Sequence, residues 1–378
     1  MAATALASVP AHGPAEEPLL PGLTELIAAQ LAPQVVDIDL KGAYPGDFLR
    51  QLGAFGGLGS LTPAALGGSG RGLRHAIQLI EEVSKECVST GFLLWAEYAL
   101  QWYLVNSPNR ELAARMLPKM ARGEVLGGTA QSNSMKSCAG IEEARLKARR
   151  VDGGYLINGV LPWVSNIGLE HYFHMGASLP DTPGLLIGLV HGSTPGLTLQ
   201  QNAHFIGMEG TNTFACQFRD VFLPDSDVVC EPSEFASFRD RTKSAFILLQ
   251  MGMGLGLIDA CVGMMTRSNK TLGHVNRFLD VQADALAEKI EREGSAPHVR
   301  ETLQLRLAGG ELSLKAANAA MLHLGAKGYL SNNAAQRRLR EAYFIAIVTP
   351  AIKHLRKELA EFDTQGCALG EEPLPEEA

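Results

Sequence analysis

The stretch that decides the fold is residues 151–168, with the sequence VDGGYLINGVLPWVSNIG. Residues 152–154 favour a turn, and residues 155–157 are typical of a strand. Asn158-Gly159 favours a type I′ hairpin turn, so residues 160–164 are predicted to return as the second strand. The pattern therefore predicts a β-ribbon whose second strand ends in a Ser-Asn pair.

Two side chains at the end of this ribbon can bind a planar ligand. Trp163 offers a broad flat face, and Ser165 offers a hydroxyl and a backbone N–H close to it. Together they can cover a planar heterocycle and hydrogen-bond its edge. The alternative is a tryptophan in the core of a hairpin, and these residues by themselves favour that alternative.

The composition is that of a globular protein with a substantial core. The chain has 378 residues, of which 46% are apolar and 19% are charged, and this length suggests two or three domains. The net charge of -7 argues against a nucleic-acid-binding surface. Six cysteines are scattered without a C-x-x-C pair, which favours reduced thiols over a disulfide framework or a zinc site.

The start of the chain does not resemble a targeting segment. Residues 1–22 lack a basic region followed by an apolar run, so we expect no signal peptide. We also find no run of the roughly 18 apolar residues that cross a bilayer. Together with the thiols, these features predict a cytoplasmic protein without a membrane segment. Because residues 1–22 are rich in Ala and Pro, we expect them to be disordered.

Helical patterns occupy the first third of the chain, at residues 73–86, 90–105 and 110–122. In the second of these, Trp95, Tyr98 and Trp102 share one face, and such a stripe is more typical of a core than of a ligand site.

Short runs of Val, Leu, Ile and Phe between Gly, Pro and Asp predict strands over residues 125–229. After residue 233 the helical period returns as four helices with short loops, which is typical of a bundle. Residues 252–256 (GMGLG) look like a dinucleotide fingerprint but lie inside continuous helix, so we interpret the glycines as sites of close helix packing. The predicted division is disordered residues 1–22, an N-terminal helical domain at 23–125, a middle β domain at 126–232, a C-terminal helical bundle at 233–365 and an acidic tail at 366–378.

Several motifs in this order resemble the acyl-CoA dehydrogenase superfamily. They are the Gly127-Gly128-Thr129-Ala130 run, the ribbon itself, the Phe205-Ile206-Gly207-Met208 segment, and residues 207–224 (GMEGTNTFACQFRDVFLP), which are similar to the family's G-x-R-x-S-x-T strand. The resemblance extends from residue 52 to residue 359. It implies an α+β fold with an N-terminal α-helical domain, a middle antiparallel β domain and a C-terminal four-helix bundle.

The resemblance also implies a flavin between the β domain and the bundle. The cofactor would be FAD, with FMN as the alternative. Thr129 and Ala130 would lie at its pyrimidine side, and Trp163 and Ser165 would flank its central ring and N5. The family habit further implies a small-molecule substrate and a homodimer or homotetramer.

The chain departs from the family at the catalytic base. A family dehydrogenase needs a glutamate within hydrogen-bond reach of the thioester α-proton. Counting from Arg340 places Thr349 where that glutamate is usually found. A subgroup places it early in the first bundle helix, and the matching position here is near Phe246. Neither Thr349 nor Phe246 can act as a base at neutral pH.

Other family marks are missing as well. The T-E-P-x-x-G-S-D loop, which helps to hold flavin and CoA, becomes TAQSNSMKSC at residues 129–138, without an acid in the matching place. This departure weakens the inference to a CoA thioester substrate.

Glu97 is the candidate for a replacement acid. By resemblance its helix lines the deep end of the substrate cavity, and desolvation beside Trp95 and Tyr98 would raise its pKa into a useful range. The alternative, which we favour from the sequence, is an exposed helix glutamate. His171 and His174 form an H-x-x-H on an expected strand or loop, where both rings would not face one metal, so no metal site is predicted.

Three functions therefore remain open from the sequence. The first is a flavin monooxygenase, because the superfamily's monooxygenase branch also lacks the glutamate; it takes reduced flavin and oxygen and hydroxylates a small organic substrate. The histidine that this branch often has is absent near Val348. The second is an acyl-CoA dehydrogenase with a relocated base. The third is a non-catalytic flavin-binding or assembly relative.

Overall fold

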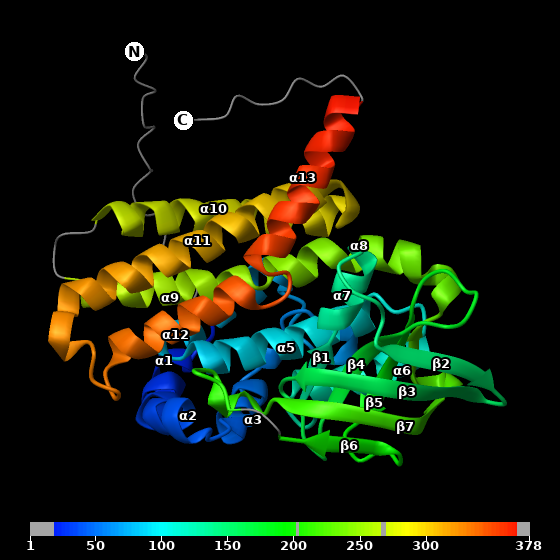
Figure 1. Ribbon diagram of the computed structural model, residues 1–378. Helices are drawn as coiled ribbons and strands as arrows, with labels where there is room; N and C mark the ends of the chain where they lie inside the picture. The colour runs from blue at the N-terminus through cyan, green and yellow to red at the C-terminus, as the bar shows by residue number, and fades with distance from the viewer. Residues whose placement is uncertain (1–18, 202–203, 266–269, 369–378) are drawn as a thin grey trace.

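The computed structural model describes residues 19–201, 204–265 and 270–368. Figure 1 shows the strands gathered at one end of the molecule, with α9, α10 and α11 side by side as a layer of long helices and α5 between that layer and the strands. The predicted α+β fold class is confirmed. Most of the segment predicted to be disordered, and the tail from residue 369, lie outside the described residues, whereas Leu19 and Leu20 pack against the core.

The N-terminal helices pack around one almost fully buried helix. Their bounds are α1 Leu23–Leu26, α2 Val35–Lys41, α3 Gly46–Ala54, α4 Gly72–Glu86, α5 Val88–Val105 and α6 Arg110–Ala121. Helix α4 ends because Cys87 adopts an extended conformation (φ -150°, ψ 111°), and α5 then begins at once. Helix α5 is buried on nearly all faces, so the tryptophan stripe predicted on it is part of a core that surrounds the helix.

The middle of the chain forms two four-stranded sheets, with strand orders β1-β4-β5-β8 and β2-β3-β7-β6. The strands are β1 Gly127–Ala130, β2 Leu146–Val151, β3 Gly154–Val164, β4 Tyr172–Ala177, β5 Leu186–His191, β6 Leu197–Gln200, β7 Phe214–Pro224 and β8 Val228–Cys230, with helix α7 at Ser132–Cys138. Phe173 of β4 and Phe218 of β7 meet edge to face between the sheets, with ring centroids 6.3 Å apart. All described strand pairs are antiparallel except β1 with β4, which is parallel.

The predicted turn at Asn158-Gly159 is wrong. Strand β3 runs through it without a break, and the chain reverses instead at residues 152–153, between β2 and β3. The Asn-Gly pair is absorbed as an irregularity against β7, where the register shifts between Ile157 and Gly159. Asn158 Oδ1 accepts from the backbone N–H of Asp220 (2.9 Å) across this shift. Long-range pairing with β7 therefore overrides the local turn preference.

The C-terminal helices are α8 Phe235–Leu248, α9 Met251–Met264, α10 Lys270–Glu293, α11 Val299–Leu324, α12 Ala334–Ile347 and α13 Ile352–Ala368. The interpretation of the glycine run is confirmed, because α9 lies directly on α4. A Cβ at Gly252 would lie 2.5 Å from the Ile77 carbonyl oxygen, and one at Gly256 would lie 2.3 Å from the Glu81 carbonyl oxygen. Glycine is required there for close backbone approach.

The helical run from Pro232 to Met264 is more apolar than the sequence reading allowed. By length and composition alone, this run could cross a membrane, and it is the one helix of the described residues that passes this test. Its mean hydropathy is 1.8. However, 83% of that window is buried inside the protein. Its apolar character is thus accounted for by packing in the helical core.

A buried ion pair joins α12 to the junction between α4 and α5. Glu341 Oε2 accepts from Arg338 Nη1 (2.9 Å), and its Oε1 accepts from the backbone N–H of Val88 (3.1 Å). Arg338 also donates to the carbonyl oxygens of Ser84 and Glu86. Both charged side chains are almost fully buried, so without Glu341 the Arg338 guanidinium would keep carbonyl acceptors but lose its acidic partner.

We expect Glu341→Ala to lower the free energy of unfolding by about 3–5 kcal/mol, because it leaves the Arg338 guanidinium buried without a counter-charge. Chemical denaturation measures the change. The matched control is Glu311→Ala, which removes an exposed pair with Arg356 (2.7 Å) and should cost less than about 1 kcal/mol. Equal effects of the two substitutions would contradict this assignment.

Candidate functional site

A cavity of about 450 Å³ lies where the sheets meet the helices. Its walls come from α5, β1, α7, β3, α8, α12 and the segment before β7. The residues that line it are Phe92, Trp95, Ala96, Thr129, Gln131, Ser132, Met135, Lys136, Trp163, Ser165, Phe205, Ile206, Gly207, Met208, Thr211, Thr213, Phe246, Arg340, Tyr343, Phe344, Ile347, Val348 and Thr349. Positions that the sequence singled out far apart in the chain therefore face one space.

Three of the four predicted cofactor residues lie together on one wall. Trp163 is the last residue but one of β3 and has 64% of its surface exposed, so it is not a core tryptophan. Thr129 and Ser165 are paired across an antiparallel bridge, and Ser165 Oγ lies 2.7 Å from Thr213 Oγ1. Ala130 does not line the cavity, because it is buried in the core of the sheets.

Thr129 also presents an unused polar atom. Its Oγ1 is buried and has no hydrogen-bond partner among the described residues. Such atoms are rare in folded proteins and call for a partner such as a ligand or water. This wall thus combines an exposed flat ring with a hydroxyl that has hydrogen-bonding capacity to spare.

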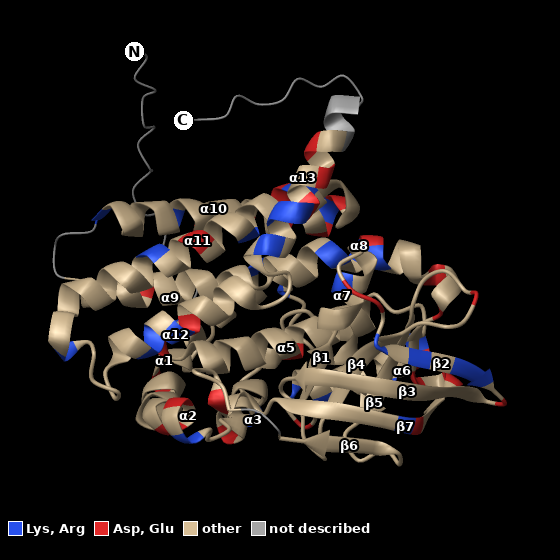
Figure 2. Cartoon of the chain, viewed as in Figure 1, with Lys and Arg blue, Asp and Glu red and all other residues tan. Residues whose placement is uncertain are grey.

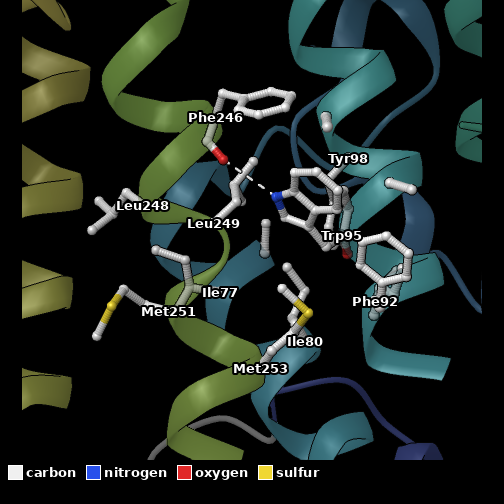
Figure 3. Packing of buried hydrophobic residues seen from close by; sticks show 14 of the residues in the cluster. Ile77, Ile80, Phe92, Trp95, Tyr98, Phe246, Leu248, Leu249, Met251 and Met253 are labelled. Carbon is white, nitrogen blue, oxygen red and sulfur yellow. Dashed lines mark hydrogen bonds between the residues drawn. The ribbon is translucent and has the colours of Figure 1, made fainter. Parts of the chain in front are cut away.

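The deep end of the cavity is aromatic, as Figure 3 shows around Trp95. Phe92 stacks on Trp95 with ring centroids 5.3 Å apart, and Phe246 meets Trp95 edge-on at 5.1 Å. Phe344 meets Phe92 edge-on at 4.7 Å. The indole N–H of Trp95 donates to the Phe246 carbonyl oxygen (3.2 Å), so its polar group is satisfied within the wall. This end of the cavity therefore excludes water and offers apolar contacts.

No Asp, Glu or His is among the described residues that line the cavity. In Figure 2, α5, which forms one wall of the cavity, is free of charge colouring over nearly all of its length. The two lining cations have acidic partners: Arg340 Nη1 donates to Asp39 (2.8 Å), and Lys136 lies 3.8 Å from Glu142. Arg340 also donates to the Ile206 carbonyl oxygen (2.7 Å) and so holds the 205–208 segment over the cavity.

Thr349 occupies the place expected for the family's base. Its hydroxyl lies 2.7 Å from Ser132 Oγ, and its carbonyl oxygen accepts from Gln250 Nε2 (2.9 Å). Gln250 in turn accepts from Arg306 Nε (2.9 Å), and Arg306 donates to the Ile345 carbonyl oxygen (2.6 Å). Thr349 is thus held in a network that contains no acid and ends at the Arg306 guanidinium.

The sequence analysis missed Arg306, which lies behind this part of the wall. The Arg306 side chain is almost fully buried. Burial lowers its pKa to about 10, so the guanidinium remains charged at neutral pH. A charged residue within the apolar run of a long helix was the available clue, but the pattern could not indicate which wall it supports.

Glu97 is not an exposed helix glutamate, so the alternative favoured from the sequence is wrong. It is fully buried, and its Oε1 accepts from the backbone N–H of Gly127 (2.9 Å) and from Asn166 Nδ2 (2.7 Å). Burial raises its pKa from 4.5 to about 8 against the opposing effect of these donors. However, Glu97 does not line the cavity. Its contacts lie behind β1.

The two histidines of the H-x-x-H have separate partners. His171 Nδ1 lies 3.1 Å from the Asn166 carbonyl oxygen, and His174 Nδ1 lies 3.2 Å from Gln131 Nε2. Burial lowers the pKa of His174 to about 3, so the ring is neutral. Within the described residues, no group of three or more His, Cys, Asp or Glu side chains could hold a metal ion.

Comparisons with known proteins agree on one family. Residues 14–124 match the model of the acyl-CoA dehydrogenase N-terminal domain. The chain is 25% identical over 338 residues to benzylmalonyl-CoA dehydrogenase of Aromatoleum aromaticum, covering 84% of this chain and 89% of that one. It is 25% identical over 354 residues to cyclohex-1-ene-1-carbonyl-CoA dehydrogenase of Geobacter metallireducens (86% and 91%). Butyryl-CoA dehydrogenase of Megasphaera elsdenii shares the fold, with a TM-score of 0.79 at 18% identity, covering 91% of this chain and 96% of that one.

The raised pKa of Glu97 predicts a pH-dependent stability. Because the folded chain keeps a proton that the unfolded chain releases above pH 4.5, stability falls as pH rises from there to about 8. The slope is at most about 1.4 kcal/mol per pH unit. Glu97→Gln keeps the acceptor and cannot ionise, so the variant should lack this slope.

Urea unfolding between pH 5.5 and 8.5 checks this, since the stability of Glu97→Gln relative to the native chain should grow with pH. The control is Glu124→Gln at a fully exposed acid whose pKa is lowered by Arg122, so it contributes nothing in this window. A difference between Glu97→Gln and the native chain that stays constant with pH would show that Glu97 is ionised throughout.

Proposed function

Because the chain is a member of the acyl-CoA dehydrogenase superfamily, we propose that it is a flavin-dependent oxidoreductase that binds FAD, with FMN as the alternative. The observation that carries this proposal is the cavity wall on which Thr129, Trp163 and Ser165 lie together. When bound, the flavin supplies the hydride or oxygen chemistry.

The residues of that wall fit a flavin. Trp163 presents an exposed planar ring of the size needed to cover a fused heterocycle. Ser165 contributes a hydroxyl and a backbone N–H at its edge, and Thr129 contributes the buried hydroxyl that has no protein partner. Polar groups that orient a ligand within a largely apolar cavity are the usual design of cofactor sites.

Within this class we propose a monooxygenase that acts on a small, uncharged organic substrate. The support is the absence of any carboxylate among the described residues lining the cavity, because thioester dehydrogenation needs a base within reach of the substrate. The task of Phe92, Trp95, Phe246 and Phe344 would then be to exclude water and hold the substrate by apolar contact.

The second candidate is an acyl-CoA dehydrogenase with a relocated base, and the names of the similar proteins favour it. Against it, Glu97, which is buried near the cavity, already accepts two hydrogen bonds behind the wall. A non-catalytic assembly role is the third candidate. In each case we propose a cytoplasmic homodimer or homotetramer.

We expect Trp163→Ala combined with Ser165→Ala to weaken FAD binding about thirtyfold, since a ring contact and a hydrogen bond each contribute about 1 kcal/mol. Fluorescence titration or the FAD content of the purified protein measures it. The control is Phe222→Ala, which removes an exposed ring on β7 outside the cavity lining and should leave binding unchanged. Full FAD occupancy in the double variant would refute this site.

The reaction class is tested with the FAD-loaded native chain. Under anaerobic conditions we expect a panel of acyl-CoA thioesters to leave the flavin absorbance unchanged, because the cavity lacks a base for the α-proton. With chemically reduced flavin and oxygen, we expect hydroxylated products from a panel of small aromatic and sulfur-containing compounds. Bleaching by a thioester would instead establish the dehydrogenase, and a chain that binds no flavin would leave the assembly role.

A further inference from the structure

A single buried asparagine links the helices to the cavity edge. Asn166 follows β3 in a left-handed conformation (φ 58°), which asparagine tolerates better than most residues. Its Nδ2 donates to Glu97 Oε1 (2.7 Å) and to the Gly127 carbonyl oxygen (2.6 Å). Its Oδ1 accepts from the Tyr44 hydroxyl (2.7 Å), and its carbonyl oxygen accepts from His171 Nδ1 (3.1 Å). We call Asn166 with these partners the Asn166 junction.

The junction is directly continuous with the wall of the cavity. The backbone N–H of Asn166 donates to the Thr211 carbonyl oxygen (2.9 Å), and Thr211 lines the cavity. Ser165 precedes Asn166 and is bridged to Thr129. The backbones approach so closely that a Cβ at Gly128 would lie 2.2 Å from the Ser165 carbonyl oxygen. A shift of Asn166 would therefore be transmitted to both Thr129 and Ser165.

The stability of the Asn166 junction depends on the charge of Glu97. Glu97 Oε2 is buried and has no hydrogen-bond partner among the described residues. Burial keeps its neighbours Tyr44 and His171 uncharged near neutral pH, by raising the pKa of Tyr44 and lowering that of His171. Arg50 lowers the pKa of Glu97, but its effect is smaller than that of burial. An ionised Glu97 would thus carry a buried charge with incomplete compensation, which is costly.

We propose that Glu97, holding a proton, is a positioning residue that fixes the Asn166 junction, and that loss of this proton loosens the cavity edge at Thr129 and Ser165. Glu97 does not touch the reacting groups. It acts through Asn166 and Gly127, which its Oε1 joins. The consequence for FAD affinity rests on the proposed function, whereas the effect on the edge does not.

Hydrogen–deuterium exchange on the full-length chain tests the edge itself. We expect residues 126–131 and 163–168 of the native chain to lose about tenfold in protection between pH 6.5 and 9, after correction for intrinsic exchange. Glu97→Gln keeps the acceptor for Asn166 and Gly127, so protection there should not change with pH. The same pH dependence in both chains, or in neither, would overturn the proposal.

A matched variant separates this local effect from a general one. Burial also raises the pKa of Glu81 to about 8, but Glu81 lies on α4 with Lys85 and Asp280 beside it. Glu81→Gln should therefore leave the pH dependence of residues 126–131 as it is in the native chain. If Glu81→Gln removed that dependence as well, a global effect would replace the Asn166 junction as the cause.

A second variant covers the case in which Glu97→Gln does not fold. Tyr44→Phe removes only the hydroxyl that donates to Asn166 Oδ1. We expect it to lower the protection of residues 163–168 at both pH values and to keep the loss between pH 6.5 and 9. Unaltered protection in Tyr44→Phe at pH 6.5, together with no loss at pH 9, would show that the Asn166 side chain does not transmit the charge of Glu97 to the edge.

Titration with FAD then measures the effect on the site. The native chain should bind FAD about tenfold more weakly at pH 9 than at pH 6.5, and Glu97→Gln should bind it equally at both. Parallel loss of affinity in the two chains would overturn the role of Glu97 in the site. Absence of FAD binding at every pH would refute the proposed function, and the exchange experiment would still decide whether Glu97 fixes the edge.

Discussion

The docking of α5 against β1 and against the segment that follows β3 is the constraint on which the site depends. Glu97 on α5 accepts hydrogen bonds from the Gly127 backbone N–H and from Asn166 Nδ2. Because backbone groups and one amide make these contacts, the two layers are fixed in register as well as in distance. Two walls of the cavity depend on that register, because Trp95 belongs to α5 and Ser165 directly precedes Asn166.

Much of this fold follows from pattern and resemblance, but its local details do not. The order of helices, strands and helices was predictable, and so was close packing at the glycines of α9. The Asn158-Gly159 turn was not, because the choice between a turn and a bulge is made by β7, some sixty residues away. The turn preference of residues 158–159 contains no information about pairing with β7.

The site divides in the same way. Thr129, Trp163 and Ser165, which the resemblance assigns to a flavin, line the same cavity, and Phe246 and Thr349 line it too. The burial of Glu97 escaped prediction, since α5 is enclosed on nearly all sides and its hydrophobic period does not mark a solvent face. Arg306 escaped for a related reason, because its partners are a glutamine and a carbonyl oxygen rather than an acid.

The bare backbone contact between α4 and α9 limits how such a chain can diverge. Gly252 and Gly256 meet carbonyl oxygens of α4 with no room for a methyl group. Any larger residue would wedge the helices apart and, through the continuous run from α8, carry Phe246 out of the aromatic end of the cavity. Related sequences should therefore tolerate substitutions of the rings that line the cavity far better than substitutions of Gly252 and Gly256, which set the position of those rings.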